Sequence, residues 1–101
     1  MMKVKLAKDN GTFTFTVAGD INTPAARELG KELHPAFEKA KRVELDFSQV
    51  AYATSELLRI LRMAQDISTT KNVPMTLRNV SEPVMNMFRL TRFDAIVTIV
   101  P

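Results

Sequence analysis

VELDFSQVAYATSELL, which spans residues 43–58, is the most informative stretch of the sequence. From Val43 to Phe47 apolar and acidic residues alternate, which is the pattern of a β-strand with one buried face. A short apolar run then leads to a polar corner, Thr54-Ser55-Glu56, and to a helix. We expect the Ser55 hydroxyl to cap this helix and Glu56 to interact favourably with the positive end of its dipole. A hydroxyl-rich helix start beside a strand end is a natural position for regulation or anion binding.

This stretch resembles the signature of STAS domains, the small modules of anti-sigma-factor antagonists. In that family an apolar strand ending in Asp is followed by Ser, a short apolar run, and Asp-Ser-Ser-Gly-Leu at a helix start. Residues 47–58 follow this frame without a gap, with Thr54 at the family's Asp, Ser55 at its first Ser, Glu56 at its second Ser and Leu57 at its Gly. The second Ser is the family's usual phosphorylated residue. The resemblance therefore places Glu56 at the phosphoacceptor position.

Two strands are predicted before this stretch, because apolar and polar residues alternate in 3–8 and again in 12–18. Asn10-Gly11 between them is a strong hairpin signal, since both residues tolerate a positive φ. The lysines of the first strand suit an edge position, where they discourage pairing with another sheet.

A helix is predicted next, with Asn22 or Thr23 as its cap and Pro24 in its first turn. Its apolar stripe keeps its phase past Pro35, which predicts one kinked helix rather than two helices. His34, the only histidine, is interpreted as a surface residue beside the kink rather than a metal ligand. The stripe comprises Ala26, Leu29, Leu33, Phe37 and Ala40.

The C-terminal half continues the alternation of helices and strands. Periodicity and capping predict a helix over 56–70, ended by a left-handed Asn72, and then a strand over 73–78 that pairs in parallel. Ser81 is the expected cap of a third helix, and residues 95–100 are expected to form the last strand.

Two further segments resemble the family. Gly19-Asp20-Ile21-Asn22 is similar to the family's Gly-Glu-Leu-Asp before its first helix, and the resemblance implies that this loop helps to form the partner surface. Near the C-terminus the family often has Leu-Thr-Gly, and here Arg92 stands at the Gly. Arg92 would cost about 1 kcal/mol if its backbone is left-handed.

The element order β-β-α-β-α-β-α-β is typical of the α/β class. Together with the resemblance, which covers residues 12–100, it predicts a STAS-like single domain over residues 1–101. We expect a mixed four- to five-stranded sheet with helices packed mainly on one face.

Composition excludes several classes of function. The 101 residues contain no cysteine, and the net charge of +3 is spread along the chain without a basic face rich in aromatic residues. We therefore expect no disulfides and no nucleic-acid partner. The start of the chain lacks the apolar core of a signal peptide, and no apolar run could span a bilayer, so a cytoplasmic protein without membrane insertion is expected. Phosphate loops, nucleophile sets and metal-ligand clusters are absent from the sequence, so we expect no enzyme activity, cofactor or metal.

The resemblance implies a regulatory protein that binds an anti-sigma factor or serine kinase and thereby controls the release of a sigma factor. The phosphorylation candidates are Ser55 and Thr54, although Ser55 also fits a plain helix cap. Glu56 fits either a fixed charge that imitates the modified state or an ordinary first helical residue. The candidate partner-binding residues are Asp20, Asn22, Thr54, Ser55, Glu56, Arg59 and Met63.

Alternatives remain open at this stage. Arg59 and Met63 fit ordinary exposed helix positions as well as partner contacts. STAS-like domains also serve as subunits of transport assemblies, including lipid transporters driven by an ABC-type ATPase, where the domain need not be phosphorylated. A weak homodimer is compatible with either function.

Overall fold

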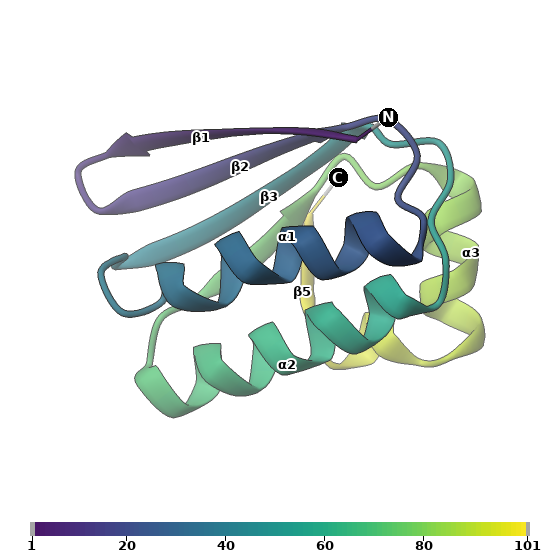
Figure 1. The fold of residues 1–101 in the computed structure, drawn as a ribbon. Helices are drawn as coiled ribbons and strands as arrows, with labels where there is room; N and C mark the ends of the chain where they lie inside the picture. Colours follow the sequence, from purple (N-terminus) through teal and green to yellow (C-terminus); the bar gives the residue numbers. More distant parts are fainter. Residues whose placement is uncertain (1, 101) are drawn as a thin grey trace.

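The computed structural model describes residues 2–100 and contains a five-stranded sheet with three α-helices (Figure 1). Met1 and Pro101, the ends of the predicted domain, lie outside the described residues, so these exact boundaries stay a prediction. The elements are β1 (Lys3–Asp9), β2 (Thr12–Ala18), α1 (Thr23–Ala36), β3 (Arg42–Gln49), α2 (Glu56–Lys71), β4 (Met75–Arg78), α3 (Glu82–Leu90), a 3-10 turn η1 (Phe93–Ala95) and β5 (Thr98–Val100).

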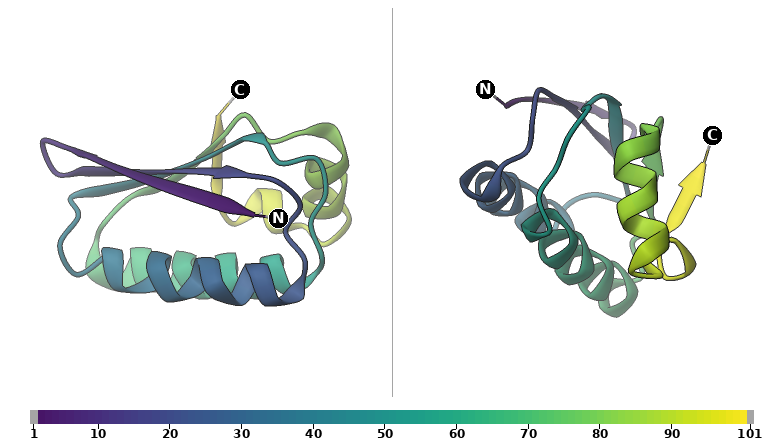
Figure 2. Two further views of the ribbon diagram at one scale, coloured as in Figure 1. Left: turned by 45° about the horizontal axis from the view of Figure 1, so that its top comes forward. Right: turned by 90° about the vertical axis from the view of Figure 1, so that its right-hand side faces the viewer.

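The strands lie side by side in chain order, β1-β2-β3-β4-β5. β1 and β2 form an antiparallel hairpin, and every later pair is parallel. Each parallel pair needs a crossover, and crossovers of one hand place successive helices on the same side of a sheet. Figure 1 and Figure 2 accordingly show α1 and α2 side by side beneath one face. The predicted mixed sheet with helices mainly on one face is confirmed.

The core lies between the sheet and the helices. The register aligns Phe15, Leu45 and Leu77 across the three middle strands, and all three side chains are fully buried. The opposite face of the sheet is polar, and there the carboxylate of Glu44 receives a hydrogen bond of 2.9 Å from Arg78. The alternation that predicted β2 and β3 thus separates a buried face from a polar one.

Several turn predictions are confirmed. Asn10 and Gly11 have φ of 51° and 87° in the β1–β2 turn, and Asn72 ends α2 with φ of 58°. Arg92 is also left-handed, with φ of 61°. The position that resembles the family's Gly therefore has the backbone that favours glycine.

The prediction of a kinked helix that continues to Ala40 was wrong. α1 ends at Ala36, with Pro35 in its last turn. After Ala36 the chain forms tighter turns with hydrogen bonds between residues three apart. The amide of Glu38 donates to the Pro35 carbonyl, and the amide of Lys39 donates to the Ala36 carbonyl, both at 3.1 Å. The apolar stripe nevertheless stays buried past the helix end, which explains why its phase suggested a longer helix.

The last strand is shorter than predicted. Residues 93–95 form η1, and strand pairing begins only at Thr98. Phe93 turns inward and packs edge-to-face on Phe88, with ring centroids 5.2 Å apart. Burying this aromatic ring keeps the chain coiled until Val97.

Replacing Arg92 with glycine is expected to stabilise the protein by about 0.5 to 1 kcal/mol, because glycine adopts a positive φ without strain. The matched control is Arg62→Gly at an exposed position inside α2, which should destabilise by about 1 kcal/mol. Urea denaturation measures both changes. A loss of stability in R92G would contradict the left-handed assignment.

Candidate functional site

Two loops that lie far apart in the sequence meet at the carboxyl ends of β2 and β3. The amide of Ile21 donates to the Tyr52 carbonyl, and the amide of Thr54 donates back to the Ile21 carbonyl, both at 2.9 Å. A parallel bridge between Ile21 and Ala53 completes this pairing. The carboxyl end of a parallel sheet is where α/β domains usually place their functional groups. The paired loops therefore form a scaffold that holds the starts of α1 and α2 together.

The β2–α1 loop brings two predicted residues to this corner. Asn22 is the cap of α1, and its Oδ1 accepts a hydrogen bond of 2.9 Å from the amide of Ala25. Thr23 contributes a hydroxyl that lies 3.4 Å from the Thr54 hydroxyl. Asp20 is exposed on the same loop, and no side-chain hydrogen bond to it occurs within residues 2–100.

The sequence predicted that the Ser55 hydroxyl caps α2, but in the structure it does not. Its backbone is already helical, with φ of −63° and ψ of −18°, and its side chain makes no capping bond. A capping side chain needs an extended backbone to reach the amides of the next turn. Here the first bond of the turn runs instead from the Leu57 amide to the Thr54 carbonyl, at 3.0 Å. The Ser55 hydroxyl is left exposed at the corner.

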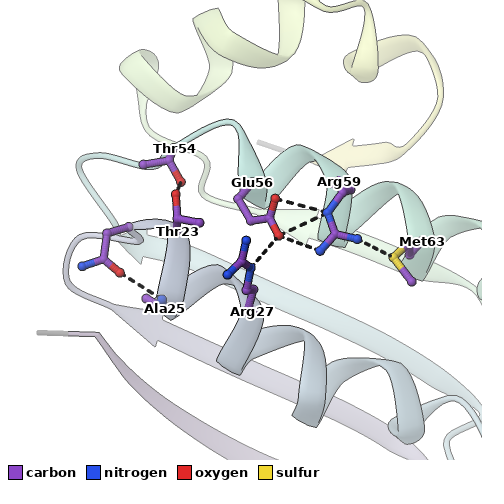
Figure 3. Close-up of polar contacts among 8 residues, drawn as sticks. Thr23, Ala25, Arg27, Thr54, Glu56, Arg59 and Met63 are labelled. Carbon is purple, nitrogen blue, oxygen red and sulfur yellow. Dashed lines mark hydrogen bonds and ion pairs between the residues drawn. The ribbon is translucent and has the colours of Figure 1, made fainter.

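Glu56, the first residue of α2, is held by two arginines from two helices (Figure 3). Arg59 donates from Nη2 to Oε2 at 2.6 Å and from Nε to Oε1 at 3.2 Å, so the guanidinium grips both carboxylate oxygens. Arg27 of α1 donates from Nε to Oε2 at 3.2 Å. The Glu56 side chain keeps only 15% of its exposure. The carboxylate therefore links α1 to α2 and is largely enclosed by its partners.

The electrostatics follow from this geometry. The hydrogen bonds from Arg59 have the largest effect on the pKa of Glu56 and lower it, whereas burial opposes them. The hydrogen bond from Arg27 and the charges of both arginines lower the pKa further, to about 2. The same contact raises the pKa of Arg59. Glu56 is thus ionised at any physiological pH, and one negative charge faces two positive charges. The cluster as a whole carries a net positive charge.

Met63 extends the site along α2. Its Sδ accepts a hydrogen bond of 3.4 Å from Arg59 Nη1, and its side chain is 43% exposed. Arg59 and Met63 therefore lie together, beside Glu56, whereas Asp20 and Asn22 lie on the neighbouring loop.

Arg27 and Gly30 were not predicted as site residues, and Thr23 was considered only as a cap of the first helix. Arg27 and Thr23 reach the corner only because α1 and α2 pack in parallel. Gly30 is a signal that could have been used, because a glycine inside an amphipathic helix often marks a close helix contact. A Cβ at Gly30 would lie 3.0 Å from the Ile60 side chain of α2.

The described residues offer no arrangement for a metal or a membrane span. Within residues 2–100, no group of three or more His, Cys, Asp or Glu side chains is placed to hold a metal ion. No helix in that range combines the length and the apolar character needed to cross a bilayer.

The sequence from residue 4 to residue 101 matches the family model described as "Mlab, STAS domain". No curated protein matched the chain. The family match covers nearly the whole sequence, including both loops of the corner.

Solved structures share the fold at low sequence identity. An anti-sigma factor antagonist from Mycobacterium paratuberculosis is 17% identical, with a TM-score of 0.88 over 100% of this chain and 86% of that one. The Bacillus cell fate determinant SpoIIAA in its phosphorylated form is 11% identical, with a TM-score of 0.77 over 98% and 92%. A sulfate transporter family protein from Wolinella succinogenes is 18% identical, with a TM-score of 0.73 over 89% and 75%.

Glu56→Gln should change the acid part of the stability profile. The folded-state pKa of Glu56 is about 2 against 4.5 for the free group, so its stabilising effect is complete above pH 4.5 and is lost as the pH falls toward 2. The stability difference between wild type and E56Q should therefore be largest near neutral pH and should shrink as the pH falls from 4.5 through 2. Urea denaturation across this range measures it.

Two comparisons make this measurement specific. Glu28→Gln removes an exposed carboxylate that contacts only Lys31, and it should alter the profile less. The pKa of Asp46 is lowered chiefly by a hydrogen bond from the Ser48 amide, so Asp46 should make the stability of every variant depend on pH in the acid range. Parallel profiles for wild type and E56Q from pH 7 to pH 2 would show that the two arginines do not stabilise the Glu56 charge.

Proposed function

The chain belongs to the STAS domain family, and from this premise we propose that it is a regulatory module that binds a protein partner without phosphorylation at position 56. The surface we assign to the partner is the corner formed by the paired loops and the first turn of α2. One observation carries the proposal: the group at the phosphoacceptor position is a carboxylate that already has two arginine partners within the chain.

Glu56 is neither a phosphorylation site nor a free imitation of one. A phosphoserine carries about −1.5 to −2 charges and three acceptor oxygens that can reorganise a partner interface. Glu56 has one charge and two oxygens, and both oxygens accept hydrogen bonds from Arg59. We infer that a partner meets the arginines around this carboxylate rather than a repelling negative charge.

Ser55 and Thr54 are the hydroxyls that remain as phosphorylation candidates. Ser55 is exposed and has no capping role, so a kinase could reach it. Thr54 is half-buried, and its hydroxyl is close to that of Thr23. Of the two, Ser55 is the better acceptor, and the protein needs neither modification for the binding proposed here.

The first partner we propose is an anti-sigma factor or serine kinase of the cytoplasm. Support comes from structural neighbours that are anti-sigma factor antagonists and from the resemblance of residues 19–22 and 47–58 to segments of the family. In this function the chain would compete with a sigma factor for its inhibitor, and its abundance rather than its phosphorylation would set the outcome.

The second partner class is a transport assembly, for example the ATPase of a lipid transporter. The closed carboxylate cluster favours it, because a permanent subunit has no need of a phosphorylation switch. A sulfate transporter family protein among the structural neighbours is consistent with this use of the fold.

The partner is tested by mild affinity capture of the tagged protein from its own cells, with mass spectrometry of partners and intact mass of the bait. A soluble kinase or anti-sigma factor would support the first class, and a membrane-associated ATPase the second. We expect the captured bait to lack the phosphoryl adduct of about 80 Da. A bait that binds only when phosphorylated at Ser55 would overturn the proposal.

Ser55→Glu should weaken partner capture by about tenfold or more, because it adds an unpaired carboxylate at the proposed interface. Thr70→Glu is the matched control, since it makes a comparable change on an exposed residue near the other end of α2. Quantitative mass spectrometry of the captured partner compares the variants. Equal losses in both would place the interface elsewhere.

A further inference from the structure

A groove of about 320 Å³ runs between α1 and α2, next to the arginine–glutamate cluster. Its apolar lining includes Gly30, Ile60 and Met63. The lining also includes His34 and Pro35, together with three cationic side chains, namely Arg27, Lys31 and Arg59. Figure 3 shows Arg27, Arg59 and Met63 between the two helices.

The groove is built into the packing of the two helices. Gly30 leaves no side chain between them, and a Cβ there would come within 3.0 Å of Ile60 Cδ1. His34, expected at the surface, is half-buried instead, and its Nε2 lies 3.0 Å from the Ile60 carbonyl, a hydrogen bond that joins the helices. Because these contacts at Ile60 hold the two helices together, the groove is preformed and a ligand need not open it.

The charges on α1 are partly segregated around the groove, although Lys31, which lines it, also pairs with Glu28 at 3.2 Å. Arg27 and Lys31, one turn apart, line it, and no acidic residue does. Glu28 and Glu32 lie on the side of the helix that faces β1, where they line a separate hollow. An acidic ligand is therefore attracted to the groove between the helices and repelled from the hollow beside β1.

We propose that this groove binds an acidic segment of the protein partner, in which one or two leucine-like side chains are flanked by Asp or Glu. The apolar lining accepts the leucine side chains, and the cations at the edges pair with the carboxylates. Arg27 uses only its Nε on Glu56, so its terminal nitrogens remain available. Lys31 pairs with Glu28 at 3.2 Å, but both side chains are exposed, so a carboxylate of the ligand can reach the Lys31 ammonium. The mixture of apolar and cationic lining suits a peptide better than a small free anion.

This inference rests on the proposed function, since it names the chemistry of the partner, but it can be tested without the partner. The probe is acetyl-Glu-Asp-Leu-Leu-Asp-Glu-amide, titrated into the isotope-labelled protein while amide chemical shifts are recorded. We expect the amides of Gly30, Ile60 and Met63 to shift at peptide concentrations on the order of 1 mM. Failure of the cellular capture would leave this titration meaningful, because it reports on the groove alone.

Protein variants make the test specific. Lys31→Glu should weaken the peptide by about fivefold, because it reverses one charge at the groove. Lys39→Glu, an equal charge change on an exposed residue outside the groove, should leave the affinity unchanged. Equal effects of the two substitutions would mean that net charge alone attracts the peptide, and this would overturn the proposal.

Peptide and anion controls test the two halves of the recognition. Two control peptides should fail to shift the groove amides. One is the same peptide with Gly-Gly in place of Leu-Leu, which lacks the apolar side chains. The other is acetyl-Lys-Lys-Leu-Leu-Lys-Lys-amide, which lacks the acidic side chains. Inorganic phosphate tests a simple anion site. The proposal would be contradicted if phosphate or the Gly-Gly peptide caused shifts of the same size at the groove amides. It would also be contradicted if the acidic peptide shifted only amides on the open face of the sheet.

Discussion

The carboxylate of Glu56 is the point at which the two helices beside the sheet are joined by charge. Glu56 begins α2, accepts three hydrogen bonds from Arg59 one turn later, and accepts a fourth from Arg27 of α1. A surface ion pair between flexible side chains usually contributes little. This cluster differs because the Arg59 contact uses both oxygens and because a second arginine closes the carboxylate from the other helix. The candidate site therefore has a fixed geometry and a charge balance that does not depend on an added phosphate.

The paired loops explain why this cluster forms where it does. Two hydrogen bonds between Ile21 and the chain on either side of Ala53 bring the ends of β2 and β3 into register. α1 and α2 then start side by side and run in parallel, with Gly30 against Ile60 as their close contact. Because the two helices pack in this way, a groove with cationic side chains lies beside the largely enclosed carboxylate of Glu56. We propose that this surface binds a partner at all times and is not controlled by phosphorylation.

Much of the fold could be predicted from local patterns. β2 was predicted with its exact bounds, and α2 within one residue, because alternation and capping are short-range signals. The end of α1 was missed because Phe37 stays buried after the helix has stopped, so burial and helical phase disagree there. The last strand was predicted to begin too early because residues 93–95 form a 3-10 turn, in which Phe93 packs on Phe88, and strand pairing begins only at Thr98.

The candidate site was only partly predictable. The resemblance to the family identified Glu56 and its neighbours. The Glu56 carboxylate also has a partner on α1, and this contact depends on how the two helices pack, which a local sequence pattern does not show. Arg27 was therefore overlooked, and the role of Glu56 stayed open between an imitation of phosphate and an ordinary helix start. The structure shows that the Glu56 carboxylate is hydrogen-bonded to two arginines of the same domain.

The most direct measurement of this account is the titration of the Glu56 side-chain carboxyl, followed by its ¹³C chemical shift in the intact protein. Enclosure by Arg59 and Arg27 requires a midpoint near pH 2, far below that of a free glutamate. A midpoint near 4.5 would mean that the arginines do not hold the charge, and Glu56 would then face the partner as an exposed carboxylate.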